Sequence, residues 1–213
     1  MLQLGFWHLA QQNPDALALV DPEGREWSRG DLFKECNRIA HGLRALGLQK
    51  GDSVAALLPN CAEFLALNLA VTQLGMYLVP INWHLAASEV AYILKDSGAK
   101  VFVSHARIES VASAAAAEVG LANETCFSIG DLKGFRHYQQ LVKDQPVSLP
   151  EERLGGMVRN YTSGTTGNPK AVVRAAWEID PETMAQSMTG MLALFGIAPE
   201  DDNVHFCGSP LYH

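Results

Sequence analysis

The chain has 213 residues, of which 48% are hydrophobic and 18% are charged, a balance that excludes an intrinsically disordered chain. Sixteen basic residues stand against 23 acidic ones, giving a net charge of −7, so no basic surplus is available to neutralise a nucleic acid. No run of about 18 apolar residues is present to cross a membrane, and four scattered cysteines argue against a zinc site or a disulfide framework. We therefore expect a soluble protein of the cytoplasm, or one peripheral to a membrane.

The N-terminal part predicts a helix over residues 2–12 and a hairpin with one strand at 17–20 and a return strand from Glu26. Ser28 and Asp31 have the spacing of a capping box, and the apolar residues that follow recur every three to four positions up to Gly47. This pattern predicts a helix with one apolar face.

Four apolar runs then alternate with helical patterns. Strands are predicted at 53–58, 77–81, 101–104 and 125–129. Helices are predicted from after Asn60 to about Gly75, at 88–97 and at 108–119. Strands that recur about every 24 residues with helices between them are typical of βαβ units. The sequence therefore predicts an α/β fold with a mostly parallel sheet and flanking helices.

The remaining pattern is weaker. Residues 132–154 are polar and are expected to form a connection across the surface. Strands are predicted at 157–161 and 171–173, a helix from Asp180-Pro181 to about residue 195, and a last short strand at 204–207.

The segment Tyr161–Lys170 carries the chemistry. Gly164 and Gly167 allow backbone amides to turn toward a ligand, and Lys170 adds a positive charge. Together with the hydroxyls of Ser163, Thr165 and Thr166, these groups suit the β- and γ-phosphates of a nucleotide. A flexible polar hairpin loop is the structural alternative, but the order of residues is too particular for it. The segment is not a Walker A loop, because Lys170 is followed by Ala171.

This segment resembles the phosphate-binding signature of the adenylate-forming superfamily, which includes acyl-CoA synthetases, peptide-synthetase adenylation domains and luciferases. The resemblance covers essentially the whole chain. Residues 51–60 resemble the first core strand of the family, and residues 208–213 resemble its Pro-Leu-aromatic-His element. The run 201–213 is most similar to fatty-acyl-CoA synthetases.

The resemblance implies an incomplete N-terminal domain of the adenylate-forming fold, with a first α/β region at 1–150, a phosphate-loop region at 151–213 and no C-terminal domain. It implies an acid–thiol ligase that uses a fatty acid or other carboxylic acid, ATP, Mg²⁺ and CoA. The residues that would hold the departing pyrophosphate are Thr162, Ser163, Gly164, Thr165, Thr166, Gly167 and Lys170. At the matching family position His213 is a catalytic residue that orders the acid pocket; in this chain alone a frayed terminal residue is the alternative.

Two departures from the family pattern affect these expectations. The family usually has Gly at the position of Ala171, and it runs to about twice this length and beyond. We therefore expect an N-terminal fragment that is inactive alone and whose exposed edge favours self-association. Two alternatives remain: an adenylation domain that loads a carrier protein, and a naturally short, non-catalytic module that binds phosphate or a partner.

Overall fold

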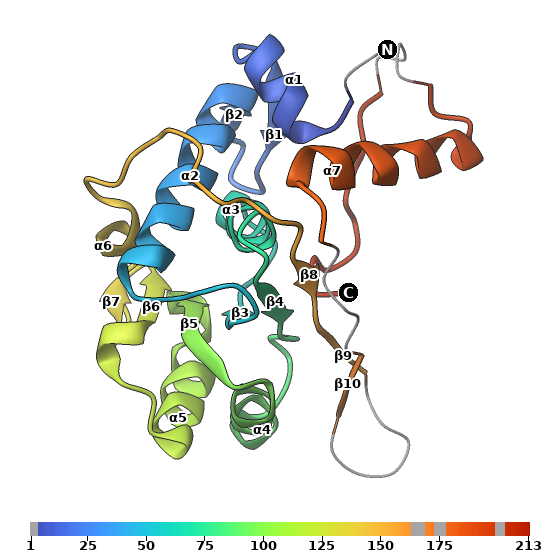
Figure 1. Cartoon of the computed structure of the whole chain (residues 1–213). Coiled ribbons are helices and arrows are strands. Elements are labelled where there is room, and N and C mark those ends of the chain that lie inside the picture. The colour runs from blue at the N-terminus through green and yellow to red at the C-terminus, as the bar shows by residue number, and fades with distance from the viewer. Residues whose placement is uncertain (1–3, 163–168, 173–177, 199–202) are drawn as a thin grey trace.

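The computed structural model describes residues 4–162, 169–172, 178–198 and 203–213. At its centre lies a six-stranded sheet with the order β7-β6-β5-β3-β4-β8 (Figure 1). All of its neighbouring strands pair in parallel, which confirms the predicted α/β fold. The strands are β3 (Ser53–Leu57), β4 (Tyr77–Pro80), β5 (Ala99–His105), β6 (Cys126–Ile129), β7 (Arg136–His137) and β8 (Met157–Val158).

Helices cover both faces of the sheet. Along β3, Val54 and Ala56 pack into the core cluster that includes α2 (Arg29–Ala45) and α3 (Ala62–Thr72). Ala55 and Leu57 pack into the opposite cluster with α4 (Ala87–Ser97) and α5 (Glu109–Val119). A parallel strand that is buried on both faces needs apolar residues at every position, which explains the continuous apolar runs in the sequence.

The N-terminal elements confirm their predictions closely. Helix α1 (Phe6–Gln12) is followed by an antiparallel hairpin of β1 (Leu17–Val20) and β2 (Glu26–Ser28). Ser28 caps α2, because its Oγ accepts a hydrogen bond from the backbone N–H of Asp31 at 3.0 Å. Short 3₁₀ turns at Ala106–Ile108 and Asn123–Thr125 precede α5 and β6.

The predicted surface connection at 132–154 is wrong in its first part. This part contains β7 and the short helix α6 (Gln139–Val142), and its residues Tyr138, Leu141 and Val142 are buried. Helix α6 packs so closely on α2 that a Cβ added at Gly42 would lie only 2.2 Å from the carbonyl oxygen of Leu141. Apolar side chains at this spacing form one helical face, and that face completes the core.

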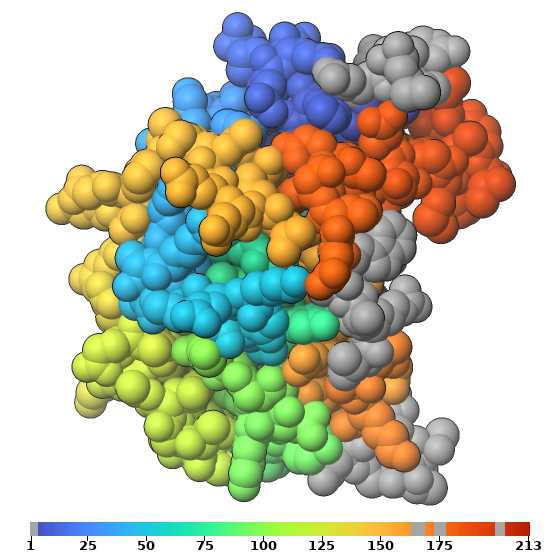
Figure 2. All heavy atoms as spheres, in the orientation of Figure 1, coloured from blue at the N-terminus to red at the C-terminus, as the bar shows by residue number. Residues whose placement is uncertain are grey.

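The C-terminal part lies along one side of the molecule (Figure 2). The strand predicted at 157–161 is divided: β8 pairs with β4, whereas β9 (Asn160–Thr162) forms an antiparallel hairpin with β10 (Lys170–Val172). Helix α7 (Pro181–Thr189) continues as a 3₁₀ helix over Gly190–Phe195, which confirms the predicted helix.

The strand predicted at 204–207 is wrong. The structure gives residues 203–207 no regular secondary structure and no pairing with a described strand, and the side chains of Val204 and Phe206 are 95% and 96% exposed. Alternating apolar residues favour a strand only where a neighbouring strand pairs with them. None of the described helices is both long and apolar enough to cross a membrane.

Candidate functional site

The β9–β10 hairpin brings the two ends of the predicted phosphate loop together. Thr162 lies opposite Lys170 in the antiparallel register, and the Thr162 hydroxyl donates to the carbonyl oxygen of Lys170 at 3.4 Å. Both residues are exposed. A threonine and a lysine on paired residues at the mouth of a loop offer a hydroxyl and a positive charge, both of which can stabilise a negatively charged group.

The middle of the loop falls outside the described residues. This applies to five of the predicted site residues, Ser163, Gly164, Thr165, Thr166 and Gly167. Their role therefore stays a prediction. What the structure describes is the frame of the loop, whose two arms are closed by strand pairing between residues 160 and 172.

Strand β9 is anchored to the sheet and to α4 from the residue before it. The guanidinium of Arg159 lies over the ring of Tyr77 at 4.6 Å, and its Nη1 donates to the carbonyl oxygen of Ser97 at 3.1 Å. The hydroxyl of Tyr161 donates to the carboxylate of Asp96 at 2.6 Å. Burial, and then the contact with Asp96, raise the pKa of the Tyr161 phenol above its ordinary value. The phenol therefore stays protonated at neutral pH and acts as an anchor.

Helix α7 is fixed to the core near its first turn. Arg153 forms an ion pair with Glu182, donates from Nε to Gln73 at 2.9 Å, and lies over the ring of Trp7 at 4.6 Å. The carboxylate of Asp180 accepts from the backbone N–H of Thr183, which lowers the pKa of Asp180 and caps the helix. The start of the hairpin and the helix that follows it are thus both attached to the α/β core.

A cavity of about 490 Å³ lies next to the hairpin, between α3, β8, the β9–β10 pair and α7. Its wall is formed mostly by apolar side chains, among them Leu69, Met157 and Met184, and it reaches Thr162. A cavity of this size is large enough for a small organic molecule.

His213 lies outside this hairpin. Its backbone N–H donates to the carbonyl oxygen of Pro210 at 3.3 Å, and its ring lies 4.7 Å from that of Tyr212. In the part of the chain that is described, no hydrogen bond joins His213 to Thr162 or Lys170. The structure therefore brings two of the predicted site residues together and places the third elsewhere.

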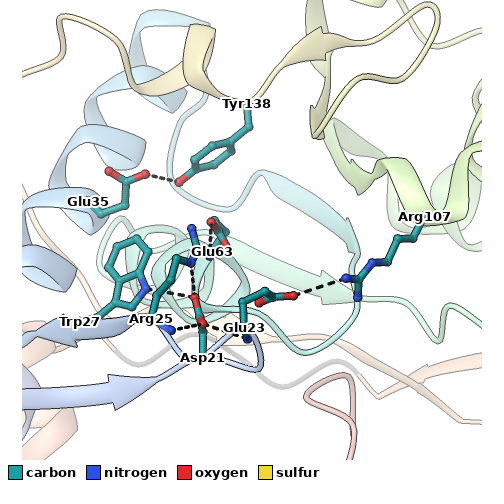
Figure 3. Close-up of polar contacts among 8 residues, drawn as sticks. All are labelled: Asp21, Glu23, Arg25, Trp27, Glu35, Glu63, Arg107 and Tyr138. Carbon is teal, nitrogen blue, oxygen red and sulfur yellow. Dashed lines mark hydrogen bonds and ion pairs between the residues drawn. The ribbon is translucent and has the colours of Figure 1, made fainter.

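Sequence reasoning missed a charged cluster at the carboxyl edge of the sheet (Figure 3). Arg25 Nε contacts the carboxylate of Asp21 at 2.5 Å, and Arg25 Nη2 contacts Glu63 on α3 at 3.3 Å. Arg107, which follows β5, reaches Glu23 at 3.5 Å. The pairs with Glu63 and Arg107 join the β1–β2 hairpin to α3 and to the residues after β5, whereas the Arg25–Asp21 pair lies within the turn of the hairpin. The spacing of four residues between Asp21 and Arg25 could have predicted their ion pair from the sequence. No sequence pattern predicts the pairs with the distant residues Glu63 and Arg107.

A second missed pair lies beside this cluster. The hydroxyl of Tyr138 donates to the carboxylate of Glu35 at 2.6 Å, and both residues are buried (Figure 3). Burial, and then the Glu35 charge, raise the pKa of Tyr138 well above its ordinary value. At the nearby edge, burial raises the pKa of the Cys61 thiol to about 12. Cys61 is therefore protonated at neutral pH and is not a nucleophile.

Among the residues with described positions, no group of three or more His, Cys, Asp or Glu side chains could hold a metal ion.

The comparisons with known proteins agree with the fold. The sequence pattern of the family described as AMP-binding enzyme matches residues 6–213. The chain is 40% identical over 174 residues to the Long-chain-fatty-acid--CoA ligase FadD13 of Mycobacterium tuberculosis, covering 78% of this chain and 34% of that protein. It is 32% identical over 212 residues to the Crotonobetaine/carnitine--CoA ligase of Citrobacter koseri, covering 94% and 40%.

A solved structure gives the same result. A protein of Rhodopseudomonas palustris, assigned as a long-chain-fatty-acid CoA ligase, superposes with a TM-score of 0.78 at 26% identity, covering 98% of this chain and 51% of the other. The chain thus spans about a third to a half of the length of these proteins. Because the family pattern extends over nearly every residue, the chain belongs to the AMP-binding enzyme family, whose members here are acyl-CoA ligases.

Proposed function

We propose that this chain supplies the part of an AMP-forming acyl-CoA ligase that binds the phosphates of ATP. The observation that carries the proposal is the β9–β10 register, which sets Thr162 opposite Lys170 and closes the loop between them. In this proposal residues 1–150 form the supporting α/β region and residues 151–213 the phosphate-loop region. We expect no turnover from the 213 residues alone, because they span about a third to a half of the length of the relatives they match.

The reaction needs charge stabilisation more than a protein nucleophile. A carboxylate oxygen of the acid attacks the α-phosphorus of ATP, and the bond to the β-phosphate oxygen breaks to release pyrophosphate. The CoA thiol then attacks the acyl carbon, loses its proton and displaces AMP. Lys170 and the Thr162 hydroxyl stabilise the charge that develops on pyrophosphate, and His213 orders the acid. Mg²⁺ accompanies ATP and neutralises further phosphate charge.

We propose a fatty acid as the substrate. The names of the Mycobacterium tuberculosis and Rhodopseudomonas palustris proteins support this choice, as does the sequence of residues 201–213. The name of the Citrobacter koseri relative points to a smaller, charged acid. A panel of acids therefore tests this part of the proposal separately from phosphate binding.

Binding of MgATP and of magnesium pyrophosphate to the 213-residue chain, measured by titration calorimetry, tests the phosphate site. A charge-assisted contact contributes about 1.5 to 3 kcal/mol, so Lys170→Met should weaken binding by roughly tenfold to a hundredfold. Lys143→Met is the matched control, because Lys143 is an exposed lysine outside the hairpin. Equal affinity in the wild type and Lys170→Met would contradict the proposal.

Turnover is tested by following pyrophosphate release and thioester formation with acids of increasing length and with CoA or a phosphopantetheinyl carrier protein as acceptor. We expect no product from the 213-residue chain. In a protein of the relatives' length that contains this chain, we expect long-chain acids and CoA to be preferred. A preference for the carrier protein would replace the proposed acceptor, and thioester formed by the short chain would refute its inactivity.

A further inference from the structure

Asn60 occupies a distinctive place in the sheet. It follows β3 after two intervening residues, Leu58 and Pro59, and precedes α3. Strand β3 has β4 on one side and β5 on the other, so the chain leaves β3 in one direction and later returns on its opposite side. In open α/β sheets, the carboxyl ends of strands at such a switch point are where ligands bind. Asn60 therefore lies at a functionally favoured edge of the fold.

The side-chain amide of Asn60 forms two hydrogen bonds with a distant segment of the chain, one from its nitrogen and one to its oxygen. Its Nδ2 donates to the carbonyl oxygen of Ser209 at 3.0 Å, and its Oδ1 accepts from the backbone N–H of Leu211 at 2.8 Å. A primary amide offers one donor side and one acceptor side, so it can pair with a backbone as a neighbouring strand does. The two hydrogen bonds span 149 and 151 residues of sequence.

The residues on either side of Ser209 show what these two hydrogen bonds do. The described residues 203–208 are all exposed, and contact with the body resumes at Leu211, which packs against the core cluster of α2 and α3. Directly after it, the His213 N–H bonds back to Pro210 and forms a turn. The path of the last five residues is thus set by one amide side chain and one apolar contact.

We propose that Asn60 is a positioning residue that fixes the Pro210–His213 turn at the carboxyl edge of β3. The role of His213 toward an acid rests on the proposed function, but the two hydrogen bonds of Asn60 do not. The experiment is therefore run on the 213-residue chain without substrates, so that failure of ligase activity and failure of this inference remain distinguishable.

The test is amide hydrogen exchange resolved by NMR on the wild type and on Asn60→Ala. Removing both hydrogen bonds should speed exchange at Leu211 by at least roughly fivefold, and it should shift the His213 ring resonances. Amides of β3 and β5 should exchange as in the wild type, because the sheet is intact. A merely structural role would instead reduce protection throughout the sheet.

Two further variants complete the design. Asn60→Asp keeps the oxygen that accepts from Leu211 and loses the donor to Ser209, so exchange at Leu211 should be intermediate between the wild type and Asn60→Ala. Asn82→Ala is the matched control, because Asn82 follows β4 and its side chain accepts within its own loop, from the N–H of His84 at 2.9 Å. Unchanged exchange at Leu211 in Asn60→Ala, or an equal change in Asn82→Ala, would overturn the proposal. If Asn60→Ala does not fold, wild-type exchange in Asn60→Asp would overturn it.

Discussion

Gly156 lies where the backbone leading into β8 crosses the end of α3, and we predict that Gly156→Ala destabilises the chain severely. A Cβ at this position would lie 2.2 Å from the carbonyl oxygen of Met76, 2.9 Å from its nitrogen and 3.0 Å from the Cα of Thr72. All three are backbone atoms, so no side-chain rotation relieves the contact. The backbones must therefore separate by about 1 Å, which is overpacking of a closed interface.

The cost follows from the bonds at this crossing. The backbone N–H of Gly156 donates to Thr72 at 2.5 Å, and that of Met157 donates to Met76 at 3.1 Å. Overpacking costs about 1 to 3 kcal/mol, and each weakened hydrogen bond costs about 0.5 to 1.5 kcal/mol. We therefore expect Gly156→Ala to lower the free energy of unfolding by about 2 to 6 kcal/mol.

Urea unfolding followed by circular dichroism measures this change. Gly190→Ala is the control, because Gly190 has a φ of −57° and an added Cβ would meet nothing within 4 Å. It should be neutral or stabilising by less than about 1 kcal/mol. Equal stability of the two variants would refute the close-approach argument.

Three further predictions concern single side chains. Burial opposes ionisation of Asp21, but the hydrogen bonds to Arg25 and Trp27 outweigh this effect and hold the pKa of Asp21 below its ordinary value of 3.8. The contribution of Asp21 to stability is therefore complete above about pH 4 and is lost as the pH falls through the lower folded-state pKa. Asp21→Asn should flatten the fall in the urea midpoint as the pH decreases below about 4, and an unchanged slope would contradict this. Tyr161→Phe removes the 2.6 Å hydrogen bond to Asp96 and should lower the free energy of unfolding by about 1 kcal/mol, whereas a thermal midpoint equal to that of the wild type would show that the anchor is not formed. Ellman's reagent should label Cys207 rapidly and the other three cysteines only on unfolding, because Cys207 is exposed and the others are buried. Cys207→Ser should therefore abolish the fast phase, and a fast phase that persists would place a second thiol at the surface.

Most of the sheet could be predicted from the sequence. Strands β3 to β6 each lie within a few residues of their predicted positions, because strands buried on both faces read as uninterrupted apolar runs. Glycine also marked boundaries correctly: α4 ends at Gly98, whose φ of +60° is left-handed.

The errors arose where distant partners decide the structure. Strand β7 has only two residues, which is too short for a periodic signal. Residues 204–207 have a strand-like pattern but no neighbouring strand in the described structure. For the site, the sequence motif located the hairpin, and the register of Thr162 with Lys170 followed only from the structure. The hydrogen bonds of Asn60 join residues about 150 positions apart, and no local sequence pattern predicts them.

The attachment of β8 has a consequence for the native ensemble. Strand β8 pairs with β4 at only two positions, and Tyr77 and Met157 are 80 residues apart in sequence. Ordering a loop of that length costs about 1 kcal/mol more than one of about 24 residues, such as that between β3 and β4. We therefore expect the edge formed by β8 to open at a lower free energy than the central strands, in a sub-global unfolding event that leaves β3 to β6 intact. Because β9 follows β8 after a single residue, we expect such an opening to loosen the β9–β10 hairpin as well, which the Tyr161–Asp96 hydrogen bond would then hold to α4.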